Sequence, residues 1–217
     1  ADHYGVRTIG NLLVGFKWIG GVMEQEDPEK FILGAEESYG YLVGDHARDK
    51  DAAVAAMLLA ELAARLKAQG QTPAEKLDEL FRRHGCHVER TISVAMPGAE
   101  GMDRMKEVMK GFRSSPPREL AGMKIAAVRD YQADAAATLY QYAGAEKPLT
   151  GDVVMLDLAE EGNFVAVRPS GTEPKVKFYM FAYAPPAESR DPAAARAVLE
   201  SRLETIEADL RKFSGVE

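Results

Sequence analysis

The sequence predicts a chain in two parts, an α/β unit over residues 1–85 followed by an α+β unit over residues 86–217. In the first part, short apolar runs alternate with amphipathic helical stretches, which is typical of a parallel α/β layer. In the second part, strand-like runs predominate and two amphipathic helices accompany them, which is typical of an antiparallel sheet covered by helices. A length of 217 residues is compatible with one or two such domains.

The first part contains short apolar runs and longer periodic stretches. The apolar runs predict strands in 7–15 and on both sides of the polar sequence AEES within 31–44. The periodic stretches have apolar residues at helical spacing, and they predict helices at 15–26, 49–70 and 72–85. Strand and helix therefore alternate up to about residue 85.

Local signals place the ends of the two longer helices in this part. We expect Asp49 or Asp51 to cap the first of them, and Gly70 to end it. The next helix begins with a capping box, in which Thr72 and Glu75 satisfy each other's backbone amides. The first of these helices also carries an apolar stripe, made of Val54, Leu58, Leu62 and Leu66.

The second part is richer in strand signals. Strands are expected at 86–96, 123–131, 153–159, 163–169 and 176–184. Helices are expected at 100–113 and 189–213, each with its apolar residues on one side. Asp191 is expected to cap the last helix, with Pro192 at its first position. The polar, alanine-rich segment that leads to about residue 150 is expected to be irregular.

Composition and charge narrow the class of function. Hydrophobic residues make up 46% and charged residues 28% of the chain, as in an ordinary soluble globular protein. The net charge of −7 gives no basic excess with which to neutralise a nucleic-acid backbone, so we expect no nucleic-acid partner.

The cysteine content and the length of the apolar runs indicate the cellular compartment in which we expect the protein. The single cysteine, Cys86, permits no internal disulfide, which fits a reducing, cytoplasmic setting. It lies in the sequence HGCH at 84–87, whose spacing matches no zinc site. No apolar run approaches the roughly 18 residues of a membrane span, and the N-terminus does not resemble a signal peptide. Because the sequence lacks an initial Met and enters a patterned region at once, we expect a fragment of a longer chain.

The sequence RPSGTEP, between the last two predicted strands, is an inventory of hydrogen-bond donors. Arg168 offers a planar guanidinium, Ser170 and Thr172 offer hydroxyls, and the amide of Gly171 is sterically open. Such donors suit an anion with several oxygens, and we expect a phosphate. The alternative is a decorated hairpin in which Arg168 pairs with Glu173.

Two further stretches contain candidate ligand-binding residues. Glu36 and Ser38, in AEES, could accept hydrogen bonds from sugar hydroxyls, although a solvated charged turn is the alternative. Lys17, in GFKWIG, could approach a phosphate as a point charge. Its alternative is a surface lysine whose stem covers Trp18.

Together and in this order, GFKWIG, EESYG and RPSGTEPKVKFY resemble the C-terminal half of the α-D-phosphohexomutase family, within its phosphoglucomutase/phosphomannomutase branch. DHARDKDA also resembles that branch, and the resemblance covers nearly the whole chain. It implies that residues 1–85 are a partial α/β domain three with the sugar-binding loop. It also implies that residues 86–217 are domain four, a TATA-box-binding-protein-like antiparallel sheet with helices and the phosphate-binding loop.

The resemblance implies an activity and roles for single residues. Family members interconvert hexose 1-phosphate and hexose 6-phosphate through a phosphoserine, a hexose 1,6-bisphosphate intermediate and Mg²⁺. Lys17 would lie near the cleft and assist phosphate binding or proton transfer. Ring hydroxyls would be bound by Glu36 and Ser38, and the non-reacting phosphate by Arg168, Ser170, Gly171 and Thr172.

Two family signatures do not occur in this sequence: a serine followed by His-Asn, and a D-x-D-x-D metal loop. We read Asp49 and Asp51 as helix caps, and we expect the missing N-terminal domains to supply the nucleophile and metal ligands. The fragment alone is then inactive and binds a small-molecule sugar phosphate, with no membrane partner. The alternative is a stand-alone module that binds sugar phosphates or other anions without catalysis. Glucose, mannose and pentose phosphates all stay open as substrates, as does the oligomeric state.

Overall fold

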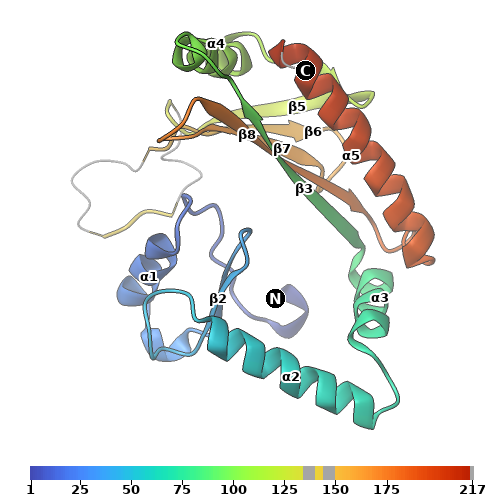
Figure 1. Ribbon diagram of the computed structural model, residues 1–217. Helices are drawn as coiled ribbons and strands as arrows, with labels where there is room; N and C mark the ends of the chain where they lie inside the picture. The colour runs from blue at the N-terminus through green and yellow to red at the C-terminus, as the bar shows by residue number, and fades with distance from the viewer. Residues whose placement is uncertain (134–139, 144–149, 216–217) are drawn as a thin grey trace. The chain divides into compact units, whose positions relative to one another are not determined.

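The computed structural model describes residues 1–133, 140–143 and 150–215. Two compact units are present (Figure 1). The first unit comprises Ala1–Lys76 together with Ala135–Gly151, and the second comprises Leu77–Asp134 together with Asp152–Glu217. Among the described residues, no helix combines the length and apolar character needed to cross a membrane.

The first unit is built around helix α1 and a β-hairpin. Two short 3-10 turns, Asp2–Tyr4 and Pro28–Lys30, accompany its regular elements, which are α1 (Phe16–Gln25), β1 (Leu33–Glu36), β2 (Gly40–Val43) and α2 (Ala52–Ala68). The two strands pair antiparallel, with Leu33 opposite Val43 and Glu36 opposite Gly40. Phe16, Met23 and Leu42 form the buried core of this unit.

The strand expected at 7–15 does not form, and this corrects the sequence analysis. Asn11 has a φ of 57° in the left-handed region, which interrupts the extended backbone that a strand requires. The only strand pairing among the described residues of this unit is the antiparallel β1–β2 pair, so a parallel layer is not present there. The AEES sequence also differs from the expected loop, because Ala35 and Glu36 belong to β1 and the turn follows them.

The helix caps match the expected chemistry. Asp51, and not Asp49, caps α2, because its carboxylate accepts from the amides of Ala53 at 2.8 Å and Val54 at 3.2 Å. The capping box of α3 (Pro73–His84) is confirmed, since the Thr72 amide donates to Glu75 at 2.7 Å and the Glu75 amide donates to Thr72 Oγ1 at 3.2 Å.

The apolar stripe of α2 is fully buried at one of its four positions, and Val54 is half-buried. Leu66 is buried, whereas Leu58 and Leu62 are 37% and 44% exposed. Amphipathic periodicity therefore predicted the helix correctly, but part of its apolar face is exposed.

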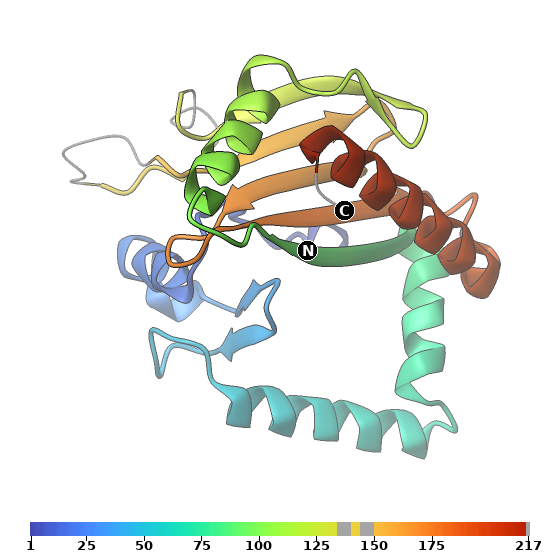
Figure 2. The same cartoon turned by 45° about the horizontal axis from the view of Figure 1, so that its top comes forward.

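The second unit is a six-stranded antiparallel sheet in the order β3-β8-β7-β6-β5-β4. Its strands are β3 (Cys86–Ala95), β4 (Glu119–Leu120), β5 (Met123–Asp130), β6 (Val154–Leu158), β7 (Phe164–Pro169) and β8 (Lys175–Ala184). Its long helices, α4 (Gly101–Ser114) and α5 (Pro192–Ser214), lie over the same face of the sheet (Figure 2).

Alternation along the strands explains this layering. Val165 and Val167 of β7 are fully buried, as are Val176 and Phe178 of β8, so these side chains form the face beneath the helices. The helices contribute matching apolar faces, and α5 buries Leu199, Leu203, Ile206 and Leu210 completely. Asp191 caps α5 as expected, by accepting from the amides of Ala193 and Ala194 at 3.1 Å each.

The compact units and the expected domains have different limits. Most of α3 clusters with the second unit, where Arg196 of α5 lies 3.5 Å from Asp78 and 5.5 Å from the Phe81 ring centroid. The described residues 140–143 cluster with the first unit although they follow β5 in sequence. The domain limits of 1–85 and 86–217 therefore stay a prediction.

Candidate functional site

The loop with the sequence RPSGTEP joins β7 to β8 in the second unit. Arg168 and Pro169 are the last residues of β7, and they lie opposite Lys177 and Val176 of β8. The Ser170 amide donates to the Lys175 carbonyl at 2.9 Å. A second bond inside the loop, from the Lys175 amide to the Glu173 carbonyl at 2.8 Å, completes a short and well-defined connection.

The tip of this loop leaves donors available. A Cβ atom at Gly171 would meet no other atom within 4 Å, so a ligand can approach the backbone there. The amides of Gly171 and Glu173 have no hydrogen-bond partner among the described residues, and the Thr172 amide reaches only Ser170 Oγ, at 3.4 Å. Open amides beside hydroxyls are the usual components of an anion-binding nest.

The decorated-hairpin alternative does not match the ion pairs of the loop. Glu173 pairs with Lys175, and this hydrogen bond is the main reason that the pKa of the Glu173 carboxyl is lowered. Arg168 forms no ion pair with any described residue. Its guanidinium is therefore available to a ligand.

Two cations lie side by side on the sheet face that the helices leave uncovered. Arg168 alternates with the buried Val167, and Lys177 alternates with the buried Val176 and Phe178, so both project from the opposite face. They occupy directly opposed positions on neighbouring strands. Like charges in such a cross-strand pair are unfavourable unless an anion neutralises them.

The sugar-loop candidates lie at the β1–β2 turn of the first unit. Glu36 ends β1, and its carboxylate folds over Gly40, where a Cβ atom would lie 2.5 Å from Glu36 Oε1. Glycine at position 40 therefore leaves the room that this carboxylate needs. Ser38 is exposed in the turn, next to Tyr39, whose φ is 64°.

Lys50 is a polar neighbour of Glu36 that the sequence analysis missed. Its pKa is raised, chiefly by a hydrogen bond with Asp49, and the negative charge of Glu36 adds to the effect. Its ammonium nitrogen also lies 5.9 Å from the centroid of the Phe16 ring. Glu36 and Lys50 lie in different parts of the sequence and no spacing rule links them. Only the fold shows that they are neighbours.

Lys17 is the second residue of α1 and is exposed. Its ammonium nitrogen lies 4.9 Å from the centroid of the Trp18 ring, within the range of a cation–π interaction. This is the geometry of the alternative interpretation, in which the lysine covers Trp18, and it leaves the ammonium at the surface.

The described residues do not fit a Mg²⁺ site. Asp51 caps α2 and lies 3.0 Å from His46, while Asp49 bonds to Lys50. Within the described part of the chain, no group of three or more His, Cys, Asp or Glu residues could hold a metal ion. Cys86 of the HGCH sequence is buried and free, and His87 packs on the Tyr183 ring at 4.5 Å.

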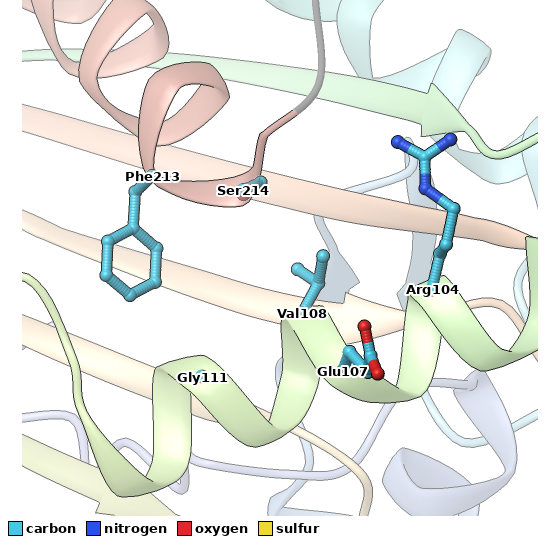
Figure 3. Close-up of a pocket in the computed structure, with 6 residues that line it drawn as sticks. All are labelled: Arg104, Glu107, Val108, Gly111, Phe213 and Ser214. Carbon is cyan, nitrogen blue, oxygen red and sulfur yellow. The ribbon is translucent and has the colours of Figure 1, made fainter.

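A shallow pocket of about 240 Å³ lies elsewhere in the second unit, between α4 and the end of α5 (Figure 3). Phe213 of α5 points toward α4, and Val108 of α4 points toward the end of α5 (Figure 3). Because both helices cover the buried face of the sheet, this pocket is separate from the Arg168 and Lys177 pair. The remaining lining residues are Arg104, Glu107, Gly111 and Ser214.

The chain matches two family models. Residues 1–84 match "Phosphoglucomutase/phosphomannomutase, alpha/beta/alpha domain III", and residues 116–204 match "Phosphoglucomutase/phosphomannomutase, C-terminal domain". Phosphoglucomutase from Staphylococcus aureus strain MRSA252 is 36% identical over 176 residues, which cover 78% of this chain and 31% of that protein. The phosphoglucomutase of strain N315 is also 36% identical, over 170 residues. This chain therefore spans about a third of the length of these relatives.

A solved structure is similar over a longer stretch. The open form of pp63/parafusin, a phosphoglucomutase from Paramecium, has a TM-score of 0.61 and covers 93% of this chain. Its sequence identity is 20%, and the chain corresponds to 34% of it, so this similarity concerns the fold alone.

Proposed function

Because this chain belongs to the phosphoglucomutase/phosphomannomutase family, we propose that it is the C-terminal part of an enzyme that interconverts hexose 1-phosphate and hexose 6-phosphate. The whole enzyme is then an isomerase that acts as an intramolecular phosphotransferase. The observation that carries the proposal is the pair of cations on directly opposed strand positions, Arg168 and Lys177, beside the open amides of the RPSGTEP loop.

In this proposal the RPSGTEP loop holds the phosphate that does not react. The Arg168 guanidinium donates two parallel hydrogen bonds to phosphate oxygens, which a lysine cannot do. The amide of Gly171 and the hydroxyls of Ser170 and Thr172 complete the contacts, and Lys177 contributes charge. A fixed remote phosphate orients the reacting end of the sugar, which converts binding energy into rate.

The β1–β2 turn contributes sugar recognition. Glu36 accepts hydrogen bonds from ring hydroxyls, and Ser38 can accept or donate, so the same turn suits either orientation of a sugar. Lys17 assists phosphate binding or proton transfer. Hydroxyl contacts of this kind do not by themselves choose between glucose, mannose and pentose phosphates, and we assign the substrate class as sugar phosphates.

The proposal assigns the remaining chemistry to the part of the enzyme beyond these residues. No serine precedes His-Asn and no D-x-D-x-D run occurs in the sequence, so the phosphoserine and the Mg²⁺ ligands come from the other domains. Hexose 1,6-bisphosphate is the intermediate, and this chain alone does not turn over substrate. A cytoplasmic location is part of the proposal, supported by the single free and buried cysteine.

Calorimetric titration of this chain with glucose 1-phosphate tests the phosphate loop. Arg168→Ala should weaken binding about 10- to 150-fold, the range for loss of one charge-assisted hydrogen-bonding group. Arg118→Ala is the matched control, because Arg118 is an exposed arginine of the same unit outside the loop. Equal affinities for the two variants would contradict the assignment. Normal binding without turnover by the whole enzyme would favour the binding-module alternative instead.

A further inference from the structure

Residues 140–143 contact helix α1, although in sequence they lie between β5 and β6. The Ala143 amide donates to Gln25 Oε1 at 2.8 Å, and Gln25 Nε2 donates to the Ala143 carbonyl at 3.2 Å. The Tyr140 hydroxyl donates to Glu26 Oε1 at 2.8 Å. These bonds attach the segment to the C-terminal end of α1.

Tyr142 attaches the same segment to the start of α1. Its hydroxyl donates to the Trp18 carbonyl at 2.6 Å, and its ring centroid lies 5.5 Å from that of Trp18. The ring also lies against Gly21, where a Cβ atom would come within 2.7 Å of Tyr142 Cε1. Glycine at this position therefore makes room for the tyrosine ring.

Helix α1 has few local features that would stabilise it. It has only 10 residues, no side-chain hydrogen bond at its N-terminal cap, and Gly20 and Gly21 in its middle. Short helices with interior glycines are weak in isolation. Most of the stability of α1 must therefore come from contacts with other segments, and residues 140–143 supply several.

Tyr142 is connected to Lys17 through the Trp18 side chain. The Trp18 side chain packs against the Tyr142 ring, and the Lys17 ammonium rests 4.9 Å from the Trp18 centroid. If the Trp18 ring loses its contact with Tyr142 and moves, the surface on which the Lys17 ammonium rests moves with it.

We propose that Tyr140–Ala143 is an anchor for α1, here called the α1 strap, and that Tyr142 is a positioning residue for Lys17. The second half of this proposal rests on the proposed function, since it gives Lys17 a part in the mutase reaction. The first half concerns only the packing of α1 and is independent of any activity.

The anchor is tested with Trp18, the only tryptophan of the chain. Tyr142→Ala removes both the hydrogen bond and the ring contact, so it should increase the quenching of Trp18 fluorescence by acrylamide and speed hydrogen exchange of α1 amides about 5- to 10-fold. Tyr142→Phe should show a smaller change, because it keeps the ring and loses the bond to the Trp18 carbonyl. Tyr4→Ala, at a 75% exposed tyrosine, is the control and should change neither signal. Unchanged quenching and exchange in Tyr142→Ala would overturn the anchor.

The positioning role is tested by a double-mutant cycle in the whole enzyme. Tyr142→Ala should lower kcat/KM roughly 10-fold, as misplacement of an active-site group does. In the Lys17→Ala background it should have almost no further effect, because the group that it positions has gone. An equal loss in both backgrounds would mean that Tyr142 acts only on stability and would overturn the role. A whole enzyme with no mutase activity would overturn both this role and the proposed function, while the Trp18 measurements would still decide the anchor.

Discussion

Replacement of Lys177 by glutamine should stabilise the protein without ligand and remove its stabilisation by phosphate. Arg168 and Lys177 face each other across β7 and β8, and Lys177 forms no close ion pair with any described residue, although its charge helps to lower the pKa of the Glu173 carboxyl, which pairs with Lys175. A directly opposed cross-strand pair is worth about 0.2–1 kcal/mol, and like charges make that contribution unfavourable. Lys177→Gln should thus raise the free energy of unfolding by up to about that amount in phosphate-free buffer at low salt.

The effect of Lys177→Gln on stability should change from stabilising to destabilising when phosphate is added. Saturation of the wild-type site at about 100 times Kd adds roughly 2.7 kcal/mol to its stability. Lys177→Gln should keep only part of this gain, because the phosphate loses one neutralising charge. A substitution that stabilises the empty protein and weakens the bound one is typical of a residue kept for function.

Thermal unfolding followed by circular dichroism, with and without phosphate, measures both effects. For a chain of this size, about 1 kcal/mol corresponds to a shift of roughly 2–4 °C in Tm. Lys110→Gln is the matched control, since Lys110 is an exposed lysine on α4 of the same unit. A lower Tm for Lys177→Gln in phosphate-free buffer would refute the reasoning, because Lys177 would then have a structural partner.

Three further outcomes are expected. Gly21→Ala should lower stability in urea unfolding, because the new Cβ meets the Tyr142 ring at 2.7 Å. Alanine favours a helix over glycine by about 1 kcal/mol, so the helix propensity alone would give the opposite result. Higher stability would mean that the ring does not pack there. Burial, followed by the charge of Tyr140, raises the pKa of Tyr142 to about 12, so the stability from its neutral form should be complete below about pH 10 and lost as pH rises toward 12. Ultraviolet titration of wild type against Tyr142→Phe checks this, and ionisation of Tyr142 near pH 10 would contradict it. Asp51→Ala should destabilise by about 1 kcal/mol through loss of the α2 cap, whereas Asp49→Ala should not; equal effects in urea unfolding would show that the cap is misassigned.

Local signals were the most reliable guide to the fold. The strand-like run at 163–169 predicted β7, in which the structure buries Val165 and Val167 between half-buried neighbours, and the caps at Asp191 and Thr72 placed two helix starts correctly. The run at 7–15 failed because apolar content alone does not make a strand; Asn11 adopts a left-handed conformation and the run has no pairing partner among the described residues.

The candidate site was predictable where its residues are contiguous. The donors of RPSGTEP could be recognised in sequence because a single loop carries them. The partnership of Arg168 with Lys177 depends on the register of two strands, and that of Glu36 with Lys50 depends on the fold of the first unit. Tyr142 contacts Trp18 across 124 positions of sequence, a separation at which no local pattern could predict the contact.

Steady-state kinetics of Arg168→Ala in the whole enzyme tests the central claim most directly. The guanidinium contacts a phosphate in both the ground state and the transition state, and it also orients the reacting end, so KM should rise and kcat should fall. We expect kcat/KM to drop about 10- to 150-fold, with partial recovery in Arg168→Lys and unfolding curves like those of wild type. Unchanged kinetic constants in the folded enzyme, or loss of folding of the sheet as the only effect, would contradict the assignment of RPSGTEP as a phosphate-binding loop.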